Sequence, residues 1–209
     1  MDRISGPGWR LAGAIVSWLL FTFCFALLFQ ATAVLAGLGG FCASGGPYVI
    51  ETECPESVIL FAPLGILGAV LAVGVGVIFA RGFAAPLVVW AWPILFVGLG
   101  IQFASSALQP GGIVFGIIAV LFILMGLAPL IFELRAGPRR IILGKTNLRG
   151  VRFQDREGAP RTFYAFGRDD PGETVAPTPG DWLLALVVWI GSAALGVWLG
   201  LQLFAAVSA

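Results

Sequence analysis

Four long stretches without a charged side chain constrain this sequence most strongly. They cover residues 12–50, 57–80, 82–132 and 182–209. A transmembrane helix needs roughly 20 consecutive, predominantly apolar residues. The third stretch is long enough for two helices, and the polar, glycine-containing segment 105–112 divides it. We therefore expect five membrane spans, near residues 11–37, 58–80, 84–105, 112–133 and 182–205.

These spans predict an all-α integral membrane protein, a five-helix transmembrane bundle with a short cytoplasmic β-hairpin-like loop. Short runs at 140–143, 151–154 and 161–166 are typical of strands and supply the expected hairpin. The predicted organisation is a four-span region with an outer loop at 38–57, a basic cytoplasmic loop and a fifth span, which cover residues 1–133, 134–181 and 182–209.

The basic residues indicate the orientation. If the N-terminus is inside, the inner segments 1–10, 81 and 134–181 contain all 12 Lys and Arg residues. Lys and Arg are enriched in cytoplasmic loops, so we expect a cytoplasmic N-terminus and an outer C-terminus. Because the basic residues are almost all Arg and Ala and Gly are abundant, we expect a multi-pass protein of a bacterial plasma membrane.

Two of the three cysteines, Cys42 and Cys54, fall in the outer loop. Disulfides persist in oxidising compartments, and closing a loop of this length contributes about 3 kcal/mol in the chain-entropy model. A redox-active pair is the alternative, but such pairs usually have Cys-x-x-Cys spacing. We therefore expect a structural disulfide, with Cys24 as a small buried residue of span 1.

The outer loop is also acidic, through Glu51, Glu53 and Glu56. A solvated acidic loop is the simpler interpretation. A cation site is the alternative, although the carboxylates do not have the spacing of a calcium loop, which supplies six to eight oxygen ligands.

Small residues at four-residue spacing allow membrane helices to approach closely. Two spans carry such a face, and we expect helix packing at Gly68, Ala72, Gly76, Ala80, Ser192, Gly196 and Gly200. The face of span 2 is continuous, so this span is predicted to be central, and Gly76→Leu is predicted to disrupt assembly.

Polar groups inside the spans are few. No Asp, Glu, Lys or Arg lies away from a span end, which weighs against a proton-coupled transporter and an ion channel. Gln30, Gln102 and Gln202 either hydrogen-bond across helices, line a polar pocket or lie separately near the interface. At the inner ends, Arg81 and Glu133 either pair or extend to water.

The chain has no histidine and none of the familiar hydrolase, zinc-protease or phosphate-binding motifs. We therefore predict no catalytic, cofactor-binding or metal-binding residues, no cofactor, and a protein that is not an enzyme. The expected partners are membrane lipids and either another integral membrane protein or a second copy of this chain, with no nucleic acid. Contact with anionic lipid is predicted at Arg135, Arg139, Arg140, Lys145, Arg149 and Arg152.

Three functional hypotheses remain open. The leading one is a non-enzymatic scaffold or accessory subunit of a larger membrane complex. The second is a carrier or binding protein for a lipid or another apolar small molecule. The third is a membrane-surface regulator that acts through the basic inner loop.

Overall fold

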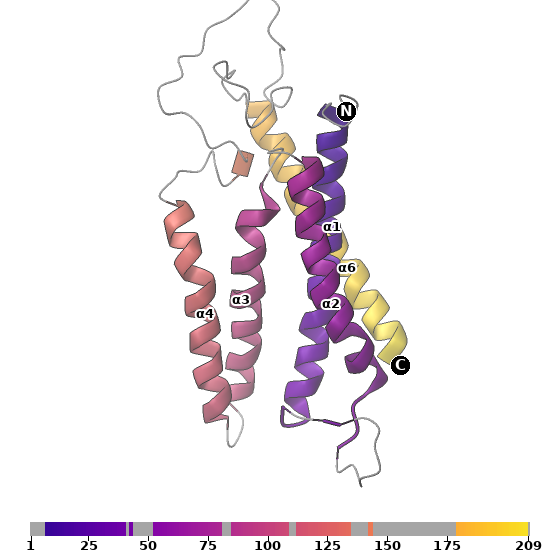
Figure 1. Cartoon of the computed structure of the whole chain (residues 1–209), viewed down its shortest axis with the longest axis vertical. Helices are drawn as coiled ribbons and strands as arrows, with labels where there is room; N and C mark the ends of the chain where they lie inside the picture. Colours follow the sequence, from indigo (N-terminus) through magenta and orange to yellow (C-terminus); the bar gives the residue numbers. More distant parts are fainter. Residues whose placement is uncertain are drawn as a thin grey trace, which may run out of the picture.

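The computed structural model describes residues 7–40, 42–43, 52–80, 85–108, 112–134, 142–143 and 179–208. This part of the chain contains five helices that are long and apolar enough to cross a membrane (Figure 1). They confirm the all-α class and the expected positions of the spans to within a few residues. The elements are α1 (Pro7–Gly37), α2 (Glu56–Val75) with its π-helical continuation η2 (Gly76–Ala80), α3 (Leu87–Ala107), α4 (Ile113–Leu134) and α6 (Pro179–Ser208).

The helices alternate in direction, so that their connections fall at two opposite ends (Figure 1). At one end, called the N-terminal end, lie the starts of α1, α3 and α6 and the ends of η2 and α4. The other end, called the disulfide end, carries Cys42 and Cys54 and the C-terminus of α6. The structure thus separates the same two groups of segments that the distribution of basic residues separated.

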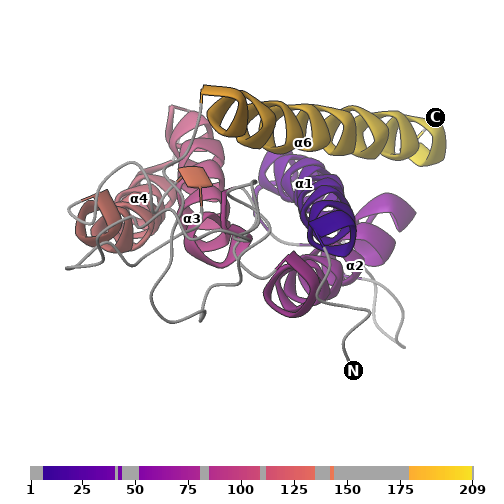
Figure 2. The ribbon, with the colours of Figure 1, turned by 90° about the horizontal axis from the view of Figure 1, so that it is seen from above.

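The central helix is α1, and the expectation that span 2 is central is wrong. Within the 18-residue apolar segment of each span, 56% of the residues are buried in α1, against 28% in α2 with η2 and 11% in α4. Viewed from above, α1 lies between α2 and α6 (Figure 2), and it also contacts η2 and α3. The small-residue face of α2 and η2 is real, but it packs mainly on α1.

Three clusters of buried side chains follow one another along α1. Each cluster combines α1 residues with residues of its neighbours, so α1 contributes to the whole length of the core. Their α1 members are Ala14 near the N-terminal end, Trp18, Phe21 and Cys24 in the middle, and Leu27 and Ala31 towards the disulfide end.

Helices α3 and α4 form a closely packed antiparallel hairpin. A Cβ atom at Gly100 would lie 2.7 Å from the Ile123 side chain, and one at Gly126 would lie 2.7 Å from Val97. The Trp92 indole N–H donates to the carbonyl oxygen of Met125 at 3.0 Å. The hairpin contacts the other helices mainly through α3, and α4 stays at the periphery, where the Phe115 ring lies near Gly40.

The inner loop is described only at Ile142 and Leu143, which are helical. The strand predicted at 140–143 is therefore wrong at these two positions. Leu143 is fully buried and packs with Ala14, Ala80 and Ala185, so this point of the loop is anchored in the core. The remainder of the predicted hairpin, Arg81 and the side chain of Glu133 lie outside the described residues. So do all six residues predicted to contact anionic lipid, Arg135, Arg139, Arg140, Lys145, Arg149 and Arg152.

Candidate functional site

An apolar groove lies in the side of the bundle, between α3 and α6 with α1 as its floor. It has a volume of about 600 Å³. We call it the Trp groove and define it by its lining residues, which are Trp18, Thr22, Ile94, Trp189, Ile190, Ala193, Ala194, Val197, Trp198 and Leu201. Its volume falls in the range of pockets that bind small molecules, but the groove is open along one side and its lining is almost entirely apolar.

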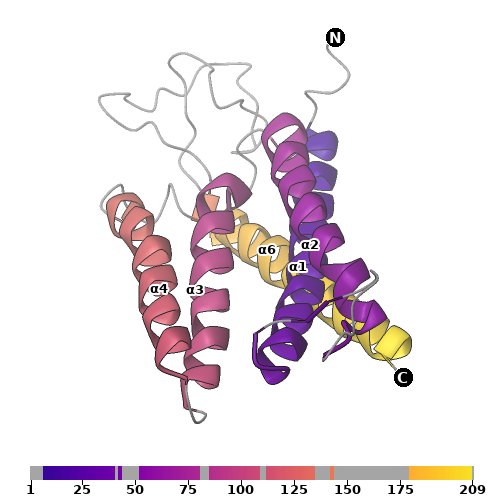
Figure 3. The ribbon, with the colours of Figure 1, turned by 60° about the horizontal axis from the view of Figure 1, so that its bottom comes forward.

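The groove exists because α6 crosses α1 obliquely. Near the N-terminal end α6 lies close to α3, and it then diverges from α3 towards the disulfide end (Figures 1 and 3). Both α3 and α6 pack on α1 but make little contact with each other. The result is a wedge that narrows towards the N-terminal end and widens towards the disulfide end.

Three tryptophans close the narrow end of the wedge. The ring centroid of Trp189 lies 5.7 Å from that of Trp18 and 5.0 Å from that of Trp90. The Trp18 indole N–H donates to the carbonyl oxygen of Ala85 at 2.8 Å, which ties α1 to the segment that enters α3. Ile94 lies one turn beyond Trp90 on α3 and therefore on the same face. We call Trp18, Trp90 and Trp189 the tryptophan stop.

The depth of the groove comes from small side chains. Ala193 and Ala194 of α6 line it where a larger residue would fill it, and the exposed Trp198 stands at its wider part. The hydroxyl of Thr22 is the only polar lining group apart from indole nitrogens, and it donates to the carbonyl oxygen of Trp18 at 2.8 Å. A ligand is therefore met mainly by hydrocarbon and aromatic rings.

A second, smaller depression of about 290 Å³ lies on α2 alone, lined by Glu56, Ile59, Leu60, Pro63, Leu64 and Leu67. Its walls come from one helix face, and Glu56 at its edge is exposed. It offers less enclosure than the Trp groove.

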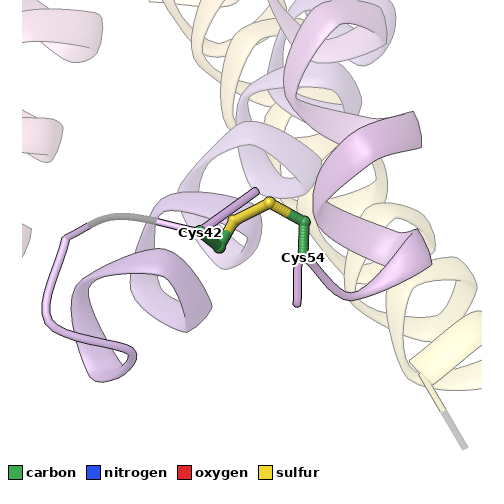
Figure 4. The surroundings of a disulfide bond; sticks show 2 residues. All are labelled: Cys42 and Cys54. Atoms are coloured by element: carbon green, nitrogen blue, oxygen red, sulfur yellow. A yellow bond between two sulfur atoms is a disulfide. The ribbon is translucent and has the colours of Figure 1, made fainter. Parts of the chain in front are cut away.

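The structure joins Cys42 and Cys54 in a disulfide with an S–S distance of 2.01 Å (Figure 4). Two backbone hydrogen bonds accompany it, from Ala43 N to Thr52 O and from Cys54 N to Ala43 O, at 3.0 and 3.1 Å. The bond connects the end of α1 with the start of α2. Glu51 lies outside the described residues, and Glu53 and Glu56 are exposed, in keeping with a solvated loop.

The predicted packing residues of α2 face α1. A Cβ atom at Gly68 would overlap the Cys24 sulfur, and Ala72 is fully buried among α1 side chains. Ala80 is also buried. Gly76 is the least crowded, because a Cβ atom there would lie 3.4 Å from Ser17, an ordinary contact distance.

The predicted packing residues of α6 also face α1. A Cβ atom at Gly196 would overlap Thr22 and the carbonyl oxygen of Leu19, and one at Gly200 would lie 2.8 Å from Ala26. Ser192 is buried. The two small-residue faces therefore do not pack on each other, and α1 receives both.

Sequence reasoning missed several positions of close approach. A Cβ atom at Gly65 of α2 would lie 2.7 Å from Leu28, and one at Gly13 of α1 would lie 2.7 Å from the backbone of Phe79 in η2. Gly98 of α3 faces the ring of Phe25. Gly65 lies three residues before Gly68, so the helical period was a usable signal for it. The Trp groove carried no such signal, because it depends on the angle between two helices.

The three glutamines differ in exposure. Gln202 is exposed, whereas Gln30 and Gln102 are partly buried. Among the described residues, no hydrogen bond joins the side chains of any two of them, which gives no support to the interpretation that they hold helices together.

Comparisons with known proteins find no matching family model, no similar curated protein and no similar solved structure. Among the residues that the structure describes, no group of three or more His, Cys, Asp or Glu side chains is placed to hold a metal ion.

Proposed function

We propose that this chain is a non-enzymatic, multi-pass membrane protein that binds the hydrocarbon part of a lipid, or a similar apolar molecule, in the Trp groove. The observation that carries the proposal is the groove itself, about 600 Å³ of apolar space with walls from three helices. Exposed apolar side chains are what lipid requires of any span, so they do not indicate a function. A recess with an aromatic end and a small-residue wall is more specific.

The volume favours a hydrocarbon chain over a transmembrane helix as the occupant. The groove follows α6 from Trp189 to Leu201, which is about 18 Å along the helix axis at 1.5 Å per residue. A helix about 10 Å wide would occupy about 1,400 Å³ over that length, whereas the whole empty space of the groove, with its open side included, is about 1000 Å³. A flexible chain can fill the wedge, and filling it recovers the dispersion contacts that an empty gap loses.

The membrane setting of this proposal follows the sequence. We place the N-terminal end in the cytoplasm of a bacterial plasma membrane, on the distribution of Lys and Arg. The groove then opens in the half of the membrane nearer the outer face, and its ligand is a lipid of the outer leaflet.

Ala194→Phe tests the proposal, because Ala194 lines the groove but is exposed, so a ring there fills the groove without entering the core. The matched control is Ala205→Phe, at an exposed position of α6 outside the groove. Native mass spectrometry of protein released from mild detergent is the measurement. We expect a retained lipid on the wild type and on Ala205→Phe, and its loss from Ala194→Phe. Equal retention by all three proteins would refute the proposal.

The leading hypothesis from sequence, a scaffold or accessory subunit, rests on a different observation. Only 11% of the residues in the apolar 18-residue segment of α4 are buried, the lowest value among the five membrane spans that the structure describes. We propose this face as the docking surface if the protein serves a complex. Purification from the native membrane followed by mass spectrometry tests it: a stoichiometric protein partner supports the accessory role, and its absence leaves the lipid-binding role. The basic inner loop of the regulator hypothesis lies outside the described residues.

A further inference from the structure

We propose that the tryptophan stop sets the length of hydrocarbon chain that the Trp groove accepts, so that Trp189, Trp90 and Ile94 determine specificity. This inference rests on the proposed lipid-binding function and deepens it. It names the recognised chemistry as a single acyl chain, selected by length.

The first step concerns which end of the groove is closed. Helices α6 and α3 lie close together near the N-terminal end and diverge towards the disulfide end (Figures 1 and 3). The stop lies at the narrow end, and Trp198 and Leu201 line the wide end. A chain that enters from the wide end therefore has its methyl end directed towards the stop. Its head group stays towards the disulfide end of the bundle.

The second step concerns the length that the groove offers. The lining extends about 18 Å along α6, and the tilt of α6 makes the depth across the membrane shorter than this. One leaflet of the hydrocarbon core is about 15 Å thick, half of about 30 Å. The groove is thus about as long as one chain of one leaflet. It crosses the middle of the fifth span, so a stop at its inner end acts at the chain's terminal carbons.

The third step concerns the rigidity of the stop. Trp18 is almost completely buried, and its indole N–H is fixed by the Ala85 carbonyl oxygen. Trp189 packs against both Trp18 and Trp90, with centroids 5.7 and 5.0 Å away. Because other rings pack against Trp189 on two sides, it cannot move aside to make room for an additional methylene group, whereas a flexible lipid tail could. Overfilling a packed site is unfavourable, so a longer chain is excluded.

The fourth step concerns the lipid head group, which the groove does not recognise. Thr22 already uses its hydroxyl within α1, and no charged side chain lines the groove. The lining offers no group that would distinguish one polar head from another. An apolar lining of this kind can distinguish lipids by the length of the acyl chain.

Two variants change the position of the stop in opposite directions. Trp189→Ala removes a ring from the stop and deepens the groove, whereas Ile94→Phe adds a ring next to the stop and shortens it. Trp9→Ala is the control, since it removes the same ring from an exposed position of α1 outside the groove. If Trp189→Ala fails to fold, Trp189→Leu replaces it as a smaller change.

The experiment equilibrates each purified protein with an equimolar homologous series of saturated phosphatidylcholines and measures the retained chains by native mass spectrometry. We expect a preferred length on the wild type, a shift to longer chains on Trp189→Ala, a shift to shorter chains on Ile94→Phe and no shift on Trp9→Ala. An unchanged distribution on the first two variants, with retention still lost in Ala194→Phe, would overturn the length-setting role alone. If Ala194→Phe retains as much lipid as the wild type, the proposed function itself fails.

Discussion

The interface between α1 and α6 and the seam between α1 and α3 are built on opposite principles. At the first, Gly196 and Gly200 bring the backbones of two helices together, and a methyl group at Gly196 would overlap atoms of α1. At the second, rings separate the helices: Phe25 fits against Gly98, and the tryptophan stop lies between α1, α3 and α6.

This difference explains why a groove appears where it does. Glycine contacts hold α6 on α1 without space between them, whereas large rings hold α3 at a greater distance. Because α6 and α3 then diverge, the space that opens cannot be filled by either helix. A membrane bundle gains no hydrophobic driving force from burying such a gap against protein, so hydrocarbon from the membrane can occupy it.

The strongest test of the tight interface is Gly196→Leu. We expect it to destabilise the bundle by more than about 3 kcal/mol, because overfilled sites usually cost 1–3 kcal/mol and here the obstacle includes backbone. The measurement is the yield of folded protein in mild detergent together with its unfolding in SDS. The control is Gly191→Leu, at a position with open space around it. A wild-type yield for Gly196→Leu would show that the interface is looser than described.

Removing the disulfide tests whether the interface between α1 and α2 also depends on a covalent bond. The variant Cys42→Ser should lower stability by up to about 3 kcal/mol, the chain-entropy value for a loop of this length. The groove lies on the other side of α1, so lipid retention should persist. Thermal unfolding with and without reductant checks the first point. A loss of retained lipid in the variant would contradict the separation of the two sides.

A smaller and more discriminating pair of changes compares a glycine of α2 with the glycine that begins η2. Gly65→Ala places a methyl group 2.7 Å from Leu28 and should cost about 1–3 kcal/mol. Gly76→Ala makes an ordinary contact with Ser17 and should be neutral, or stabilising by up to about 1 kcal/mol through helix propensity. The measurement is the free energy of unfolding of both variants, determined in parallel by denaturation. If Gly76→Ala proved the more harmful of the two, the packing of α2 on α1 would need revision.

The smallest expected effect concerns the seam. Trp18→Phe removes the hydrogen bond to the Ala85 carbonyl oxygen, and such bonds between membrane helices average about 0.6 kcal/mol. Trp92→Phe is a matched change, because it removes a comparable bond to Met125 inside the α3–α4 hairpin. Trp92→Phe should cost little more than its bond because Trp92 is half-exposed, whereas Trp18→Phe should cost more because the smaller ring also leaves a cavity in the core. Only Trp18→Phe should alter the retained lipid. Identical retention in the two variants would argue against a role of the seam in shaping the groove.

Much of this fold could be predicted from local pattern. Span positions follow from runs of apolar residues, and the faces that carry Gly68, Ala72, Gly196 and Gly200 follow from four-residue spacing. The disulfide of Cys42 and Cys54 follows from their place in one loop. Each of these features is determined by residues within a short segment of the chain.

What could not be predicted depends on distant segments. Spacing shows that Gly68 meets a partner helix but does not say which one, so the central role of α1 was missed. The tilt of α6 across α1 results from Gly196 and Gly200 meeting particular α1 residues, and the groove results from that tilt. The insertion of Leu143 into the core likewise depends on a space formed by three other helices.

The most direct test of the account is a structure of the full chain in lipid nanodiscs, with attention to the space between α3 and α6. We predict a rod of density along Ala193 and Ala194 that ends at the tryptophan stop, with α1 at the centre of the bundle. A structure in which α3 and α6 close against each other, leaving no space for a chain, would contradict the account.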